Sequence, residues 1–292
     1  MMNFNYFNPS NLSVFKDTVQ KLAGYALVAG GTDLLVKMKE KIISPPNLID
    51  LSNLVELKGI RLSDGGYLDI GAMTTHVELV NSALVKKHAR ILAQAASQIG
   101  SPQIRNMGTV GGNIGNASPA ADTAPALLVL DAKVNVDGIT GCEEKDLYQI
   151  FKSPGSLKLR HGQVITKFKI CTIKENEGAA FIKLGKRKAL AISVLNCAVW
   201  LKVSQGHIAN VRIALGSVAP TPLRLFEVED WLLGKKIQTE VLETAARMAK
   251  DIIKPIDDIR STAEYRKSIA EVTVLRGLKI ALQEAQEECG NE

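Results

Sequence analysis

The segment TVGGNIGNASPAAD, residues 109–122, is the most informative stretch of this 292-residue chain. Around its start, Gly108, Gly111 and Gly112 fall within five residues, beside a threonine and an asparagine. Glycine loses more conformational entropy on folding than any other residue, so such a run is costly to order. Runs of this kind are typical of loops built for a ligand. The segment predicts a backbone nest, a concave row of N–H groups that holds an anion.

A second glycine pair lies near the N-terminus, in the segment VAGGTDLL at residues 28–35. A short apolar strand is expected at 25–29, and it leads through Gly30 and Gly31 into a helix that Thr32 can cap. The first N–H groups of a helix lack intrahelical acceptors, and the helix dipole is positive there, so an anion can bind. An ordinary tight turn explains this segment equally well when it is taken alone. The two segments together predict a ligand with two phosphates, such as the dinucleotide FAD.

Several other nucleotide and catalytic signatures are missing. The sequence has neither the G-x-G-x-x-G of a Rossmann domain nor a P-loop, and neither H-E-x-x-H nor G-x-S-x-G occurs. The four histidines are far apart, and the acidic residues form no evident acid–base pair, so no catalytic residue is predicted. The four cysteines have the spacing of neither a zinc site nor an iron–sulfur cluster, so no metal site is predicted. These patterns indicate a protein that holds a cofactor.

Composition and charge exclude several broad classes of protein. Hydrophobic residues make up 46% of the chain and charged residues 23%, which is typical of a globular protein. The net charge of +6 comes from scattered lysines, so nucleic-acid binding is not predicted, whereas an anionic small ligand fits. Residues 1–9 lack the regions of a signal peptide, and no apolar run reaches the ~18 residues that span a bilayer. We therefore expect a soluble, cytoplasmic protein with reduced thiols and no membrane insertion.

Periodicity along the chain predicts an α+β protein. Before residue 175 it indicates a helix over 81–99 and strands at 67–70, 133–136 and 164–172. The polar stretch at 174–178 is turn-like and is expected to separate two domains. Beyond it, the alternation of apolar and polar residues predicts an antiparallel sheet followed by helices. The expected strands are 179–184, 195–203 and 207–215, and the expected helices are 224–233, 239–253 and 262–287.

Taken together, these segments resemble the FAD-binding middle subunit of molybdenum hydroxylases, a family that includes xanthine, carbon monoxide and nicotinate dehydrogenases. AGGTDLL at 29–35 and the segment at 109–122 resemble the two flavin motifs of the family, and QIRN at 103–106 precedes the second motif. The later signatures are Phe181-Ile182-Lys183 followed by Arg187, GSVAPTPLR at 216–224, and DDIRSTAEYR at 257–266. The resemblance covers nearly the whole chain in order.

The resemblance implies a two-lobed FAD-binding domain of the PCMH or vanillyl-alcohol-oxidase type at 1–175, with lobes of about 1–57 and 58–175. It implies a C-terminal domain at 176–292 like that of the CO dehydrogenase flavoprotein. It also implies that residues 28–36 wrap one side of the FAD pyrophosphate and that residues 109–113 hold the other side. The implied cofactor-binding residues are Val28, Ala29, Gly30, Gly31, Thr32, Asp33, Leu34, Leu35, Ile99, Thr109, Val110, Gly111, Gly112, Asn113, Ser118, Asp122, Ile165 and Lys183.

Some of these residues also have plainer interpretations. Asp122 can cap the helix that follows it, although a buried carboxylate needs hydrogen-bond donors, which ribose or ribityl hydroxyls could supply. Without the resemblance, Ile99 and Ile165 are interpreted as core residues and Lys183 as a solvated lysine. The family often carries an acid shortly after Arg187, where this sequence has Ala191. A contact from that acid to the flavin or to an electron acceptor is therefore missing.

The resemblance implies a place in a larger complex. In the family, the substrate is hydroxylated at a molybdenum–pterin centre in a large subunit, and electrons pass through [2Fe–2S] clusters in a small subunit to FAD. FAD then reduces an acceptor, often NAD. We therefore expect both partner subunits, in a dimer of heterotrimers. The acceptor is NAD, ferredoxin or quinone, and a purine such as xanthine is the default substrate.

Two alternatives stay open. One is a stand-alone FAD oxidase or reductase of the same flavin fold, which would need its own substrate pocket and an acid or base near the flavin. The other is a cofactor-free module that serves only in assembly. The substitution Gly111→Val is expected to abolish flavin binding and to leave the fold largely intact.

Overall fold

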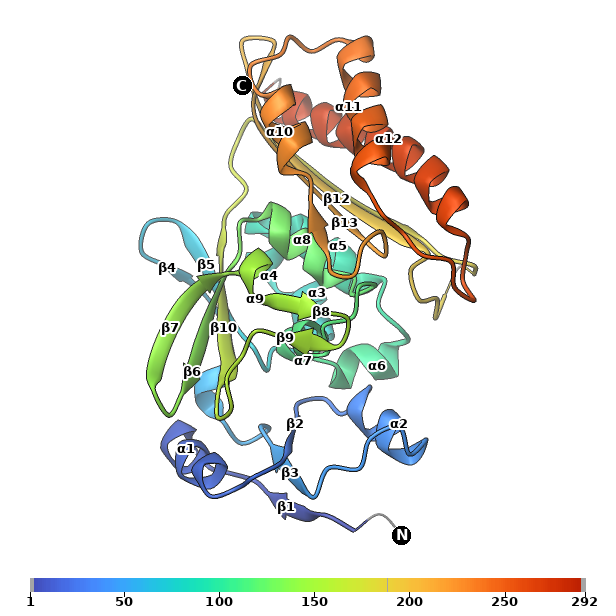
Figure 1. Ribbon diagram of the computed structural model, residues 1–292. Coiled ribbons are helices and arrows are strands. Elements are labelled where there is room, and N and C mark those ends of the chain that lie inside the picture. Colours follow the sequence, from blue (N-terminus) through green and yellow to red (C-terminus); the bar gives the residue numbers. More distant parts are fainter. Residues whose placement is uncertain (1–2, 188, 290–292) are drawn as a thin grey trace.

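The structure is a computed structural model that describes residues 3–187 and 189–289. Three bodies are stacked along its length: a small N-terminal lobe, a middle lobe, and a C-terminal sheet covered by helices (Figure 1). The α+β class predicted from the sequence is confirmed. Among the described residues, no helix has the length and apolar character needed to cross a membrane.

The N-terminal lobe is built on a parallel sheet in the order β1-β3-β2. Its strands are β1 (Asn5–Phe7), β2 (Ala26–Val28) and β3 (Asn47–Asp50), and its helices are α1 (Leu12–Gln20) and α2 (Leu34–Lys39). The side chain of Asn11 caps α1, which buries Phe15 and Val19. A short 3-10 helix, η1 (Val55–Leu57), leads into the middle lobe.

An antiparallel sheet in the order β4-β5-β10-β6-β7 forms one side of the middle lobe. Its strands are β4 (Ile60–Ser63), β5 (Tyr67–Gly71), β6 (Lys133–Gly138), β7 (Gly141–Asp146) and β10 (Val164–Cys171). The helices beside it are α3 (His76–Asn81), α4 (Ala83–His88), α5 (Arg90–Ser97), α6 (Pro102–Met107), α7 (Val110–Gly115) and α8 (Thr123–Val129). A small insertion comprises α9 (Leu147–Ile150), β8 (Phe151–Ser153) and β9 (Ser156–Leu157).

The single helix predicted over 81–99 is wrong, because α3 ends at Asn81 and the chain then forms the two short helices α4 and α5. The hydroxyl of Ser82 accepts a hydrogen bond from the N–H of Val85, and Ser82 itself is extended. Serine side chains compete with the helix for backbone N–H groups in this way. The second break falls at Ala89, which is fully buried and leaves the helical conformation.

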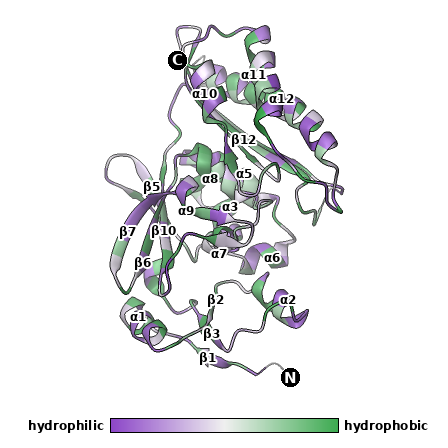
Figure 2. Cartoon of the chain, viewed as in Figure 1, coloured by the Kyte–Doolittle hydropathy of each residue, from purple (hydrophilic) through white to green (hydrophobic). Residues whose placement is uncertain are grey.

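The C-terminal part is an antiparallel sheet of β11 (Glu177–Leu184), β12 (Leu195–Ser204), β13 (His207–Gly216) and β14 (Leu223–Arg224). Three helices follow the sheet, as predicted: α10 (Phe226–Leu232), α11 (Thr239–Ile252) and α12 (Ala263–Cys289). They pack on its outer face (Figure 1). The inner face packs on α8, with Ala198 and Trp200 in the same core as Leu127. Hydrophobic colouring along α8 and β12 marks this contact (Figure 2). The middle lobe is therefore enclosed between the other two bodies.

Candidate functional site

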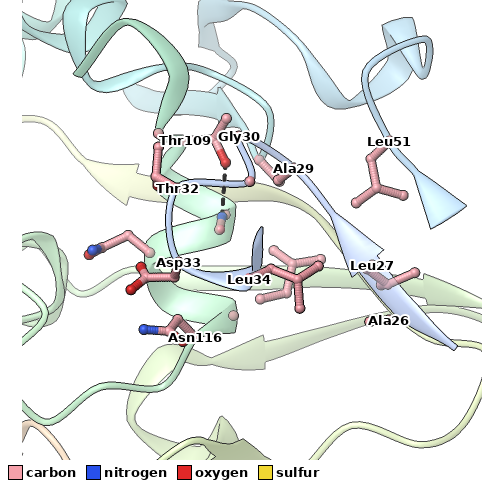
Figure 3. A pocket seen from close by; sticks show the side chains of 18 of the residues that line it. Ala26, Leu27, Ala29, Gly30, Thr32, Asp33, Leu34, Leu51, Thr109 and Asn116 are labelled. Carbon is pink, nitrogen blue, oxygen red and sulfur yellow. Dashed lines mark hydrogen bonds between the residues drawn. The ribbon is translucent and has the colours of Figure 1, made fainter. Parts of the chain in front are cut away.

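A cavity of about 640 Å³ lies between the N-terminal lobe and the middle lobe. Its wall comes from the turn after β2, from α7, from the insertion around β9 and from the start of β10 (Figure 3). The predicted cofactor-binding residues that line it are Ala29, Gly30, Gly31, Thr32, Asp33, Leu34, Ile99, Thr109, Gly111, Gly112, Asn113 and Ile165. A cavity of this size lies within the usual range of cofactor pockets.

The remaining predicted residues do not line this cavity. Val28 belongs to β2, and the side chain of Leu35 is half exposed. Val110 is fully buried in the core of the middle lobe, and the hydroxyl of Ser118 accepts a hydrogen bond from the backbone of Ala120. The other two members of this group, Asp122 and Lys183, bind each other and are considered below.

The turn between β2 and α2 presents unpaired backbone donors. Within residues 3–187 and 189–289, the N–H groups of Gly31–Leu34 have no hydrogen-bond acceptor. Gly31 has a φ of 70°, a conformation that glycine adopts without steric cost. Asp33, rather than the predicted Thr32, occupies the N-cap position of α2, and its side chain makes no capping hydrogen bond. These free donors at a helix start form a site suited to an anion.

The second glycine segment is a short helix, α7, so the predicted loop nest is wrong. All four N–H groups at the start of this helix are already paired within the protein. They are Val110 to Thr74 O (2.9 Å), Gly111 to Ala72 O (2.8 Å), Gly112 to Thr109 Oγ1 (3.0 Å) and Asn113 to Thr109 O (2.9 Å). The backbone N–H groups of Val110–Asn113 are therefore not free to bind an anion.

The glycines of both segments allow close approach between backbones. A Cβ atom at Gly30 would lie 1.9 Å from the carbonyl oxygen of Met107, and one at Gly111 would lie 2.6 Å from that of Ala72. Because backbone atoms cannot move aside as a flexible side chain can, any larger residue at these positions forces the chain apart. The expectation that Gly111→Val leaves the fold largely intact is therefore wrong. Gly115, in contrast, has open space around its Cβ position and lines the cavity.

Two buried polar atoms in the cavity wall lack a partner among the described residues, namely His76 Nδ1 and Gln163 Nε2. Burial, together with the nearby charge of Arg105, lowers the pKa of His76 to about 4, so its imidazole is neutral at pH 7. An unpaired buried polar atom costs roughly 1–3 kcal/mol. Sequence reasoning missed both residues, because a lone histidine or glutamine carries no local motif. The free N–H groups, the glycine surfaces and these unpaired atoms together fit a polar, phosphate-bearing cofactor such as FAD.

Asp122 lies at the start of α8, but it does not cap the helix. Its carboxylate accepts hydrogen bonds from Lys183 Nζ at 2.6 Å, Ser193 Oγ at 2.5 Å and Asn196 Nδ2 at 2.8 Å. Lys183 also donates to the carbonyl oxygen of Gln98, the residue next to Ile99 in the cavity wall. The side chain of Lys183 is only 7% exposed, so it is not the solvated lysine of the plainer interpretation. This pair ties the C-terminal sheet to the middle lobe beside the cavity.

The signature at 257–266 contacts Ser193, one of the hydrogen-bond partners of Asp122. Arg260, in the signature at 257–266, donates to the carbonyl oxygen of Ser193 at 3.1 Å. Arg260 and Arg266 both bind Asp258. Burial alone would raise the pKa of the Asp258 carboxyl, but these hydrogen bonds hold it well below its usual range.

The signature at 216–224 ends in Arg224, which contacts the opposite end of α8. Its guanidinium binds Glu229, Asp131 and the carbonyl oxygen of Leu128. Cationic groups at a helix C-terminus interact favourably with the helix dipole. Arg224 therefore gives the signature at 216–224 a role in the contact between the C-terminal sheet and the middle lobe. Among the described residues, no group of three or more His, Cys, Asp and Glu side chains could hold a metal ion.

The two N-terminal lobes and the cavity between them fit the class of proteins that bind a flavin dinucleotide. Family comparison agrees: residues 2–172 match the model of the FAD binding domain in molybdopterin dehydrogenase, and residues 180–281 match the CO dehydrogenase flavoprotein C-terminal domain. The chain belongs to the family of FAD-binding medium subunits of molybdenum hydroxylases.

Individual relatives are similar over nearly their full length. The xanthine dehydrogenase FAD-binding subunit of Escherichia coli O157:H7 is 30% identical over 97% of this chain and 98% of the relative. The nicotinate dehydrogenase FAD-subunit of Eubacterium barkeri is 32% identical over 91% and 92%. Among solved structures, carbon monoxide dehydrogenase from Hydrogenophaga pseudoflava matches with a TM-score of 0.94 at 32% identity, covering 97% of this chain and 98% of that chain.

Proposed function

We propose that this chain holds FAD between its two N-terminal lobes and relays electrons from [2Fe–2S] clusters of a partner subunit to an acceptor such as NAD. The observation that carries the proposal is the cavity of about 640 Å³, which is lined both by Gly31–Leu34, whose N–H groups have no acceptor among the described residues, and by the glycines of α7. Bound FAD supplies the redox chemistry, and the chain supplies position and electrostatics. No side chain of this protein needs to act as an acid or a base in that role.

Within this proposal, each wall of the cavity has its own task. The N–H groups of Gly31–Leu34 donate to the pyrophosphate, and Gly111 and Gly112 form the adjoining wall without blocking it. Ile99 and Ile165 supply apolar surface. The proposed site keeps Asp122 and Lys183 at its edge, and it omits Val28, Leu35, Val110 and Ser118, which lie away from the cavity.

We place the domain boundary at about residue 175, between the two matched family models. The proposed partners are a small [2Fe–2S] subunit and a large molybdopterin subunit, in a cytoplasmic dimer of heterotrimers. The relatives named as FAD-binding subunits and medium chains support separate partner chains. The proposed substrate of the complex is a xanthine-type purine, supported by the xanthine dehydrogenase relative. A nicotinate dehydrogenase relative has similar identity, so we assign the choice of substrate to the large subunit.

The test is an absorbance spectrum of the purified chain, followed by heat release of the cofactor and metal analysis. We expect a yellow protein that releases about one FAD per chain and contains neither iron nor molybdenum. Added with its two partner chains, it should restore NAD reduction, whereas the chain alone should not oxidise a purine. A colourless chain that cannot be loaded with FAD would overturn the proposal, and so would substrate oxidation by the chain alone.

A further inference from the structure

Lys37 lines the cavity but lies outside both glycine segments. Among the described residues that line the cavity, the charged side chains are Asp33 and Lys37. The imidazole of His76 is neutral, because its pKa is lowered to about 4. Among the described residues that line the cavity, Lys37 therefore carries the positive charge. A ligand with two phosphates would meet one ammonium group here, alongside backbone donors.

Lys37 lies on the same face of α2 as Asp33, the residue at the start of the helix. The backbone N–H of Lys37 donates to the carbonyl oxygen of Asp33 at 3.0 Å, which places the two residues one helical turn apart. Asp33, Leu34 and Lys37 all line the cavity, whereas Leu35 and Val36 are half exposed on another face of the helix. An anion bound at the start of α2 therefore lies on the side to which Lys37 extends.

The present partner of Lys37 is neutral and belongs to the other lobe. Its Nζ donates to Oδ1 of Asn116 at 2.6 Å, and Asn116 follows α7 as its C-cap residue. No carboxylate forms an ion pair with Lys37 within residues 3–187 and 189–289. The ammonium is charged in either bond, but a phosphate oxygen adds the attraction of an opposite charge, so it is a better acceptor than the neutral amide oxygen. An anion that reaches the ammonium therefore competes favourably with the amide of Asn116.

We propose that Lys37 is the side chain that recognises the phosphates of the flavin nucleotide, and that it exchanges its hydrogen bond with Asn116 for one with a phosphate oxygen. This inference rests on the proposed FAD site and adds a determinant of specificity to it. Lys37 discriminates flavins that carry phosphates from riboflavin, which has none. Because the contact is ionic, it weakens as salt is added.

The experiment compares Lys37→Met with Lys39→Met in the full chain. Lys39 lies on the same helix and is exposed outside the cavity, so its replacement makes the same change in net charge without touching the site. Methionine is a good helix former, so α2 should persist, and thermal unfolding without FAD checks this. Dissociation constants for FAD and for riboflavin are measured by quenching of flavin fluorescence, at low and at high NaCl concentration.

We expect Lys37→Met to weaken FAD binding roughly tenfold to hundredfold and to change riboflavin binding less than about twofold. Its FAD affinity should depend less on salt than that of the wild type, Lys37→Arg should recover much of the loss, and Lys39→Met should match the wild type. Equal FAD affinity in Lys37→Met and wild type would overturn the inference while the proposed function stands. An equal loss for FAD and riboflavin would also overturn it, because it would mean that Lys37 shapes the cavity. Failure of the wild type to bind FAD would overturn both proposals.

Discussion

The turn at residues 29–34 and the helix α7 at Val110–Gly115 line one cavity side by side, and both are rich in glycine (Figure 3). Their backbones are in opposite states. In the turn, the N–H groups of Gly31–Leu34 have no acceptor among the described residues, whereas the first N–H groups of α7 are all paired within the protein. The turn therefore supplies donors to a ligand, whereas the glycines of α7 allow other backbone segments to pack closely against the helix. The number of glycines in a segment does not distinguish these two roles, but the state of its N–H groups does.

The largest expected effect comes from Gly111→Val, which should disrupt the close packing of α7 on Ala72. The new Cβ would lie 2.6 Å from both the Cβ and the carbonyl oxygen of Ala72, and Ala72 also accepts the N–H of Gly111. We expect the free energy of unfolding to fall by about 3 kcal/mol or more, and FAD binding to be lost with it. Urea unfolding followed by circular dichroism measures the change. Wild-type stability in this variant would contradict the packing described for α7.

Low pH should reduce the free energy of unfolding through protonation of His76, which lies next to the start of α7. The backbone N–H of His76 donates to the carbonyl oxygen of Gly108, and its ring is buried. Its pKa is about 4 in the folded chain and about 6.5 when unfolded, so the unfolded state binds the extra proton below pH 6.5. The free energy of unfolding is therefore unaffected by His76 above pH 6.5. It falls by about 3 kcal/mol as the pH is lowered from 6.5 towards 4.

Urea unfolding at pH 7 and at pH 4.5 measures this loss in the wild type and in His76→Phe, which cannot titrate. The variant should lose less stability than the wild type between the two pH values. If both lose the same amount, His76 is not the group responsible.

The substitution Gly115→Val should separate binding from stability on the same helix. Its Cβ meets no atom within 4 Å, its φ is not positive, and the residue lines the cavity. We expect a change in unfolding free energy within about 1 kcal/mol, because valine replaces glycine at a helix end without a clash. FAD binding should weaken about tenfold or more, since the side chain enters the cavity. Isothermal titration with FAD measures the loss, and unchanged affinity would mean that FAD does not contact this face of α7.

The smallest expected effect compares the N-cap residues of the two helices. Thr109 caps α7 through the N–H of Gly112, whereas the side chain of Asp33 makes no capping bond to α2. Thr109→Ala should therefore cost about 1 kcal/mol of unfolding free energy, and Asp33→Ala should cost almost nothing. Thermal unfolding of both variants measures the difference. Equal losses would show that the two helix starts are capped alike.

Much of the fold could be predicted from local patterns. The C-terminal strands alternate clearly, and the helices 239–253 and 262–287 have long periodic sequences, so α11 and α12 were predictable. The helical state of α7 was not, because Gly111, Gly112 and Gly115 all disfavour a helix. Its start is held by the carbonyl oxygens of Thr74 and Ala72, and no local pattern reports such distant partners.

For the candidate site, sequence patterns led to the glycine segments but not to the contacts that complete the wall. The unpaired atoms of His76 and Gln163 depend on burial by other elements, which a single residue type does not predict. Lys37 resembled any helix lysine until the fold brought Asn116 to it from the other lobe. The three contacts to Asp122 likewise come from residues 61 to 74 positions away in sequence.

Amide hydrogen exchange with and without FAD tests the difference between the two glycine segments most directly. The experiment follows residues 31–34 and 110–113 in the full chain after the cofactor is removed and after it is restored. Our account predicts that 31–34 exchange fast without FAD and become protected when FAD is added, while 110–113 are already protected and change little. Strong new protection at 110–113 with none at 31–34 would contradict it, because the pyrophosphate would then bind α7 and not the turn.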